Sequence, residues 1–332
     1  MPFLATGTAR NITGAGHIID CGKQDDPTHP AQQPTPRGGG YHRKFLATGS
    51  DRRPASSDLA RELREENAAL GGAAMDTPSY MKAVVEQTST LADWVHGRDA
   101  ATPVPTCPDW TLADLVDHVG GTQRMVTMLV GEQMTEPSRA FAGYVPGPAD
   151  PGQWRAWLSD GAAEARQAFA SVTDDTPVWD PSGGGAGVPF WSRRLLGEAC
   201  VHRADAAAAL GTPYELAPEL AVAAIEDWLD TMTSRGYWEN RPGFADAMRG
   251  SGQTLHFHAT DAPGEWVARR EPDMVALERT HSKADVAVRG PAVDLLLVIS
   301  RRRPLDAAPT LELLGNQALL DHWIEHMDWV TG

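Results

Sequence analysis

Three side chains in the sequence could together bind a divalent metal ion. Glu198 and His202 are four residues apart, so a helix would place them on one face, one turn from each other. His118 lies between the apolar residues Leu115 and Val119 of another helical stretch, and we expect it to face the interior. A helical bundle can bring such groups together in its core.

The chemistry of these three residues favours a catalytic metal site. Two imidazoles and one carboxylate suit Zn²⁺, although Ni²⁺, Co²⁺ or Fe²⁺ could also be bound. Three protein ligands leave at least one coordination position open, as in catalytic zinc sites. The Glu198–His202 pair and His118 each also have a simpler interpretation. Glu–His pairs with this spacing are common on helix surfaces, and a single interior histidine is more often a packed core residue than a ligand.

The residues that would carry the site lie in four stretches with helical periodicity. Asp76 or Thr77 can cap the first helix, and Thr111 with Asp114 resembles a capping box at the start of the second. Gly211 is a typical C-cap for the fourth. The stretches cover approximately residues 76–95, 111–130, 150–170 and 190–211. Four helices joined by loops predict a four-helix bundle over residues 75–212.

The pattern changes after residue 212. A helix is expected over about 218–234, and the segments TLHFHAT, EWVARR, DMVALE and ADVAVRG then read as short strands. The remainder predicts a helix in PAVDLLLVISR, a strand in TLELLG and a closing amphipathic helix in NQALLDHWIEHMDWV. Residues 213–332 are therefore expected to form a smaller α+β domain, which gives the chain an α plus α+β fold in two domains.

Residues 1–74 differ in composition from the rest of the chain. Gly, Pro, Ser, Thr and Gln dominate stretches such as DDPTHPAQQPTPRGGG, and no helical or strand periodicity begins before Leu59. Such a segment cannot bury enough apolar surface to offset the entropy of ordering it. We expect residues 1–74 to be a disordered extension, with Met75 as a candidate for the true start.

Charge and composition exclude several classes of partner. The 332-residue chain has a net charge of −15, which disfavours nucleic-acid binding because phosphate neutralisation needs a basic face. The three cysteines are too few and too dispersed for a disulfide framework or a CxxC motif, which favours a reducing compartment. No apolar run approaches the ~20 residues of a membrane-spanning helix. We expect a cytoplasmic monomer or homodimer without nucleic-acid or membrane partners.

Two stretches resemble the signature of the mycothiol-dependent maleylpyruvate isomerase family. VPTCPDWTLADLVDHVGG is similar to a helix start that leads to a metal-ligating histidine, and EACVHRADAAAALG is similar to the last helix of the family's bundle. The matching residues are Cys107, Pro108, Trp110, Thr111, His118, Glu198, His202, Arg203, Asp205 and Ala206. VRGPAVDLLLVISRRRP and LELLGNQALLDHWI resemble the family's second domain, which is related to sterol carrier proteins. The resemblance covers about residues 75–332.

The resemblance implies a DinB-like bundle whose metal is held by His118, Glu198 and His202. It also implies mycothiol as a thiol cosubstrate: the metal-bound thiolate would add to the double bond of an electrophilic or unsaturated small substrate, and rotation and elimination would return the trans isomer. An arginine should then hold the substrate carboxylates or the developing enolate. Arg289, just before the GPAVDLL turn, is the candidate, and a surface arginine beside a turn is the alternative.

Two other functions are consistent with the same residues. One is a metal-dependent hydrolase that uses metal-bound water, although the helix lacks an HExxH motif and supplies no obvious general base. The other is a non-enzymatic metal-binding or regulatory protein. The chain also departs from the family pattern. Many relatives carry a second histidine shortly after the first, and this chain has Gln123 and Arg124 nearby. Many also have histidine just before the glutamate, where this chain has Gly197.

The remaining candidate residues have simpler interpretations. His322 and His326 are four residues apart, but the apolar stripe of their helix is explained by packing. His256 and His258 share one face of an expected strand, and a contribution to an active-site wall is the alternative. Cys107 would lie about three helical turns, or ~16 Å, from the metal-ligating histidine of its motif, so we do not expect it to supply the nucleophile.

Overall fold

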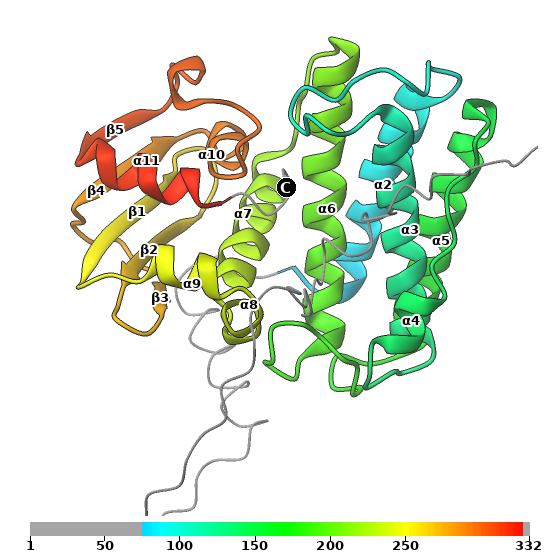
Figure 1. Cartoon of the computed structure of the whole chain (residues 1–332), viewed down its shortest axis with the longest axis horizontal. Helices are drawn as coiled ribbons and strands as arrows, with labels where there is room; N and C mark the ends of the chain where they lie inside the picture. Colours follow the sequence, from blue (N-terminus) through cyan, green and yellow to red (C-terminus); the bar gives the residue numbers. More distant parts are fainter. Residues whose placement is uncertain (1–74, 328–332) are drawn as a thin grey trace, which may run out of the picture.

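The computed structural model of the protein describes residues 75–327. The expectation that residues 1–74 are disordered concerns residues outside this range. The described chain has helices in its first part and a five-stranded sheet with further helices in its second part (Figure 1). The α plus α+β fold class expected from the sequence is confirmed.

Four long helices form the bundle of the first part. They are α2 (Thr77–Val95), α3 (Leu112–Gly131), α5 (Trp154–Ala170) and α6 (Gly187–Leu210). The short helix α4 (Ser138–Ala142) lies in a connection and was not expected from the sequence, whereas the short helix η1 (Pro151–Gln153) directly precedes α5 and falls within the stretch 150–170 expected to be helical. Both α2 and α3 pack against α5 and α6, so the two helices that follow each other in the chain lie diagonally across the bundle. Residues 96–111 must therefore cross one end of it.

Three helix ends form where the sequence predicts them, because local capping groups are present. The side chain of Asp76 accepts a hydrogen bond from the backbone N–H of Ser79. Thr111 and Asp114 form the capping box at the start of α3. Gly211 ends α6 with a φ of 63°, in the left-handed region that glycine adopts without strain.

The second part begins with α7 (Pro218–Thr233), α8 (Arg235–Asn240) and α9 (Pro242–Met248). The strands are β1 (Gln253–Ala259), β2 (Glu265–Arg270), β3 (Val275–Glu278), β4 (Val286–Gly290) and β5 (Glu312–Gly315). Their order is β3-β2-β1-β4-β5, with β1 and β4 parallel and the other neighbours antiparallel. The remaining elements are α10 (Ala292–Ile299), η2 (Leu305–Ala307) and α11 (Gln317–Glu325). Helices α8, α9 and η2 were not expected.

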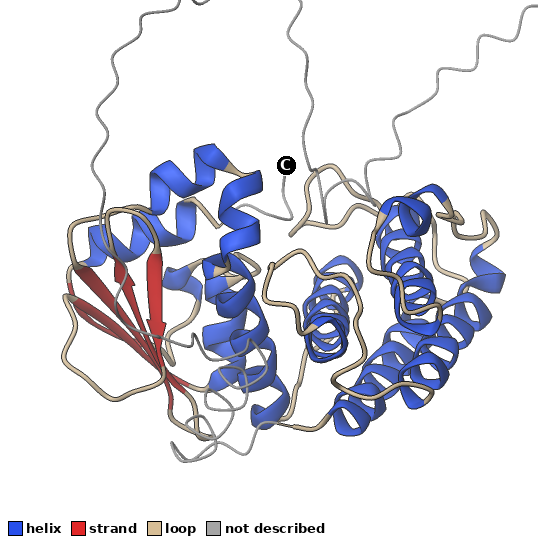
Figure 2. Cartoon of the chain, turned by 90° about the horizontal axis from the view of Figure 1, so that it is seen from below, coloured by secondary structure: helices blue, strands red, loops and turns tan. Residues whose placement is uncertain are grey.

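The sheet turns one face to the helices of the second part. Phe257 of β1 contacts Trp323 of α11, and the indole N–H of Trp266 on β2 donates a hydrogen bond to Glu226 of α7. Helix α7 lies between the sheet and α6, as Figures 1 and 2 show from two sides. One apolar core runs from the bundle across α7 to the sheet, so the two parts share buried surface. None of the helices between residues 75 and 327 is long and apolar enough to cross a membrane.

Candidate metal site

His118, Glu198 and His202 meet in the bundle, as their positions on α3 and α6 predict. The Nε2 atoms of His118 and His202 lie 3.0 and 2.9 Å from the same carboxylate oxygen, Oε2 of Glu198. All three side chains are buried, and one potential ligand atom from each lies within 4.8 Å of the others. Two imidazole nitrogens and a carboxylate oxygen facing one point are a donor set that fits a divalent transition metal.

Asp205 fixes the orientation of His202. Its Oδ2 lies 2.8 Å from Nδ1 of His202, one turn along α6, so Nδ1–H donates to the carboxylate and the Nε2 lone pair is directed at the site. Arg302, after α10 in the second part, binds Asp205 with two nitrogens at 3.0 Å each. Burial acts to raise the pKa of Asp205, but Arg302 and then His202 outweigh it and leave that pKa well below its usual value.

Arg194 holds the other oxygen of the metal-site carboxylate. Its Nη2 binds Oε1 of Glu198, one turn further along α6, and its Nη1 donates to Oδ2 of Asp227 on α7 at 2.6 Å. Burial acts to raise the pKa of Glu198, whereas Arg194 and the hydrogen bonds to the two histidines lower it, and the lowering prevails. Glu198 is therefore ionised, with Oε1 occupied by Arg194 and Oε2 turned toward the imidazoles.

Trp110 covers one side of the imidazole pair. Its ring centroid lies 4.9 Å from that of His118 and 5.6 Å from that of His202, the latter in a stacked arrangement. Trp110 directly precedes the N-cap of α3, and its backbone is hydrogen-bonded to Val104 within the 96–111 connection. The connection across the end of the bundle thus brings an aromatic wall to the site.

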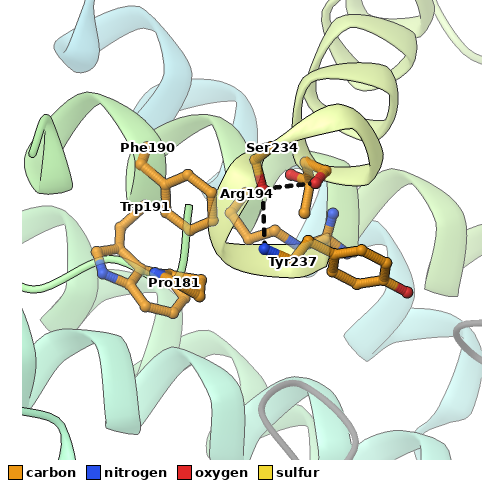
Figure 3. Close-up of a pocket in the computed structure, with 7 residues that line it drawn as sticks. Pro181, Phe190, Trp191, Arg194, Ser234 and Tyr237 are labelled. Atoms are coloured by element: carbon orange, nitrogen blue, oxygen red, sulfur yellow. Dashed lines mark hydrogen bonds between the residues drawn. The ribbon is translucent and has the colours of Figure 1, made fainter. Parts of the chain in front are cut away.

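A pocket lies beside this site, at the start of α6. Its cavity volume is about 20 Å³, which is room for about one water molecule. Its walls are Pro181, Phe190, Trp191, Arg194, Thr231, Ser234 and Tyr237 (Figure 3). Phe190, Arg194, Glu198 and His202 follow one another at four-residue spacing along α6, so they form one stripe. Arg194 is the member that belongs both to the pocket wall and to the contacts of Glu198.

Cys107 lies closer to the site than a continuous helix would allow. It sits in a turn before α3, not on the helix, and its Sγ is 3.7 Å from the same Asp205 oxygen that binds His202. Burial and the neighbouring Asp205 raise the pKa of the Cys107 thiol to about 12 despite Arg302 beside it. Burial likewise raises the pKa of Cys200 to about 12. Both are thiols at neutral pH, which makes them poor nucleophiles.

This state of the thiols predicts slow alkylation. At pH 8, the thiolate fraction of Cys107 should be roughly a thousandfold below that of an ordinary exposed cysteine, so iodoacetamide should leave Cys107 and Cys200 unmodified in the folded protein. Both should be labelled after unfolding. Peptide mass spectrometry of folded and unfolded samples measures this, and rapid labelling of Cys107 in the folded protein would show that a thiolate is available beside Asp205.

Arg289, the candidate arginine of the sequence, is not brought together with the three metal-site residues. It lies on β4, half-exposed, with its Nε 3.2 Å from Oε2 of Glu312. Its catalytic role stays a prediction. The arginines that the structure does place around the site are Arg194 and Arg302. Arg194 could have been found from its four-residue spacing to Glu198, whereas Arg302 gave no local signal.

Each departure from the family pattern has a structural role. A Cβ at Gly197 would lie 2.4 Å from Oδ2 of Asp227, so a side chain at this position would require the Asp227 carboxylate to move. Gln123 is buried and its Nε2 donates to Thr88 at 2.9 Å. Arg124 places its guanidinium 3.3 Å from the ring centroid of Trp157 on α5. These residues pack the bundle and add no ligand to the site.

The other histidine pairs have separate surroundings. His322 and His326 are held by hydrogen bonds on and around α11: Nε2 of His322 donates to the carbonyl of Ala247 at 2.8 Å. They belong to none of the groups of potential metal ligands found among residues 75–327. His256 and His258 lie on one face of β1 as expected, in a second such group with Glu265 and His281.

Comparisons with known proteins bear on the family. The model of the mycothiol maleylpyruvate isomerase N-terminal domain matches residues 81–207, and the model of the C-terminal domain of the same family matches residues 219–322. Among curated proteins, no sequence matches this chain. A crystal structure of the mycothiol-dependent maleylpyruvate isomerase is 13% identical and covers 72% of this chain and 93% of its own, with a TM-score of 0.42.

Two further solved structures are similar to parts of the chain. The UbiJ-SCP2 ubiquinone synthesis protein is 18% identical over 36% of this chain and 96% of its own, with a TM-score of 0.26. An inverting sec-alkylsulfatase from Pseudomonas sp. is 16% identical over 61% of this chain and 42% of its own, also with a TM-score of 0.26. The two domain models, which together span most of the chain and include all three metal-site residues, show that it belongs to the mycothiol-dependent maleylpyruvate isomerase family.

Proposed function

We propose that the protein is a metal-dependent enzyme that uses mycothiol to act on an electrophilic or unsaturated small molecule. The observation that carries this proposal is the convergence of two Nε2 atoms on one carboxylate oxygen, at 3.0 and 2.9 Å, in the buried centre of the bundle. The family supplies the expectation of a thiol cosubstrate. Zn²⁺ is the metal that we propose, since imidazole and carboxylate ligands suit it.

The side chains around the site fix the ligand atoms before a metal binds. Asp205 sets the tautomer of His202, and Arg194 occupies one oxygen of Glu198 so that the other faces the imidazoles. Trp110 shields the pair of rings from one side. When bound, the cation would supply Lewis acidity that lowers the pKa of an incoming thiol. Burial keeps both cysteines of the described part of the chain, Cys107 and Cys200, protonated, which favours an external thiol.

The pocket at the start of α6 is the proposed place for the substrate. Its aromatic walls, Phe190, Trp191 and Tyr237, suit a planar unsaturated molecule. The guanidinium of Arg194 in the wall is already paired with Glu198 and Asp227, so it offers no free positive charge to a ligand. The four-residue stripe leads from this pocket to Glu198, about 6 Å along the helix for each step. We propose that the unsaturated part of a small substrate binds here after the wall side chains move apart, because the pocket as it stands holds about one water molecule. Arg289 stays the candidate for binding substrate carboxylates.

A thiol-dependence assay tests this function. Zinc-loaded protein is given maleylpyruvate and other unsaturated acids, with and without mycothiol, before and after chelation. We expect turnover that needs both the metal and the thiol, because no thiolate is available from the described cysteines.

Two outcomes would contradict the proposal. Equally fast turnover without any thiol, abolished by chelation, would favour a hydrolase that activates water at the same site. If mycothiol is still consumed after the metal has been chelated, the reaction does not depend on the metal. Dithiothreitol in place of mycothiol is the control that separates a general need for thiol from recognition of this one.

A further inference from the structure

A second group of potential metal ligands lies on the outer face of the sheet, away from α7. His256 and His258 are two residues apart on β1, so they share one face, while Leu255 and Phe257 point to the helices. Glu265 lies opposite His258 in the register of β1 and β2. His281 comes from the connection between β3 and β4. One potential ligand atom from each of the four lies within 4.8 Å of the others.

The strand register explains how His281 reaches this face. Strand β3 ends at Glu278, which pairs with Val267, and Val267 in turn pairs with His256. Strand β4 starts at Val286, which pairs with Leu255. The connection therefore starts and ends level with the middle of β1. Because β2 and β1 lie between β3 and β4, the connection must pass over one face of these two strands. Helices cover the other face, so the connection crosses the face that carries the histidines.

The separations of the ligand atoms suit a tetrahedral zinc ion. With zinc–nitrogen distances of 2.0–2.1 Å, neighbouring ligand atoms in a tetrahedron are ~3.3 Å apart. The Nε2 atoms of His256 and His258 lie 3.3 and 3.4 Å from the two oxygens of Glu265. Nδ1 of His281 is 2.7 Å from Oε2 of the same carboxylate. Small side-chain shifts would bring three nitrogens and one oxygen around a common centre.

His256 provides an independent sign of a ligand. Its side chain is about 5% exposed, and its Nε2 makes no hydrogen bond within the part of the chain that the structure describes. The nearby Glu265 oxygen, at 3.3 Å, does not have hydrogen-bond geometry toward it. A buried ring nitrogen without such a partner loses the free energy of solvation, and a metal ion bound to its lone pair would compensate for this.

We propose that His256, His258, Glu265 and His281 form a second zinc site that fastens the β3–β4 connection to the sheet. Four protein ligands complete a tetrahedron, so this site is closed and structural, unlike the three-residue site in the bundle. Residues 280–284 make no backbone–backbone hydrogen bond to any described residue, and a ligand at position 281 would hold them. Arg289, opposite His258 on β4, is paired with Glu312, so its charge is offset.

Zinc stoichiometry tests the proposal on the full chain. Protein stripped by chelation is dialysed against buffered zinc, and bound metal is measured by mass spectrometry. We expect two zinc ions per chain in the parent and one in His281→Gln and in His258→Gln. His281 is largely exposed, so its replacement should leave the fold intact. His326→Gln, which also removes one of two neighbouring imidazoles, is the matched control and should retain two.

Proteolysis gives a second readout, because Lys283 is exposed in the same connection. Trypsin cleavage after Lys283 should slow about tenfold when free zinc is ten times the dissociation constant, in the parent and in His326→Gln but not in His281→Gln. If the parent binds a single zinc ion, which Glu198→Gln removes and His281→Gln does not, the second site is refuted while the bundle site stands. Equal cleavage rates with and without zinc in the parent would also overturn the proposal.

Discussion

Replacing Glu198 by glutamine is expected to empty the metal site in the bundle. The substitution keeps the shape of the side chain but removes the charge toward which both imidazoles point. Loss of a residue that only orients a ligand typically weakens metal binding ~10–100-fold, so loss of a ligand carboxylate should exceed that range. Metal content after dialysis should fall by one equivalent per chain, and thiol-dependent turnover should fall with it.

A control separates this effect from the loss of any ion-paired carboxylate. Asp294 on α10 is also ion-paired, to Arg303, and lies outside both groups of potential metal ligands. Asp294→Asn should therefore keep the full metal content. Circular dichroism should show both variants folded. Parent-like metal affinity in folded Glu198→Gln would mean that Glu198 is not a ligand and that the three-residue site is wrong.

Replacing Arg302 by methionine is expected to destabilise the whole fold. Asp205 is fully buried, and Arg302 is the cation that binds both of its oxygens. Breaking a buried ion pair by removing one partner costs about 3–5 kcal/mol, which corresponds to roughly 6–20 °C in melting temperature for a protein of this size. Arg303→Met is the control. Its partner Asp294 is partly exposed, and the cost should be about 1 kcal/mol or less.

The destabilisation by Arg302→Met should depend on pH in a defined direction. The pKa of Asp205 is lower in the folded protein than in the unfolded chain, so its contribution to stability is present above the unfolded value and is lost as the pH falls. The gap in melting temperature between parent and variant should thus be full at neutral pH and narrow below about pH 4. If the difference in melting temperature stays constant down to acid pH, the loss of stability comes from packing and not from the ion pair.

The sequence predicted the helices, the strands and the side-chain groupings that depend on local pattern. Helices α2, α3, α5 and α6 follow from apolar periodicity and from caps such as Asp76 and Gly211, and the strands follow from alternation. Helical geometry alone was enough to predict that Glu198 and His202 lie on one face of a helix. The final helix ends at Glu325, earlier than the apolar pattern suggested, because amphipathic periodicity alone contains no stop signal.

The partners that organise the site could not be read in the same way. Asp205 and Arg302 are 97 residues apart, and nothing in the basic run 301–303 distinguishes its middle member. Their pairing is fixed by how the second part packs on α6. The position of Cys107 relative to the site could not be predicted from the sequence either. Counting residues along a helix places it far from the site, whereas a turn before α3 brings its sulfur to Asp205.

The contact at Gly197 has a consequence for how the sequence can change during evolution. A Cβ at position 197 would meet the carboxylate at position 227, so any larger residue there requires that carboxylate to move. Such a shift would displace Asp227 from Arg194 and so loosen the hold of Arg194 on Glu198. Substitutions at the two positions are therefore coupled. A lineage that acquires a bulky residue before the glutamate has to substitute or reposition the α7 acid.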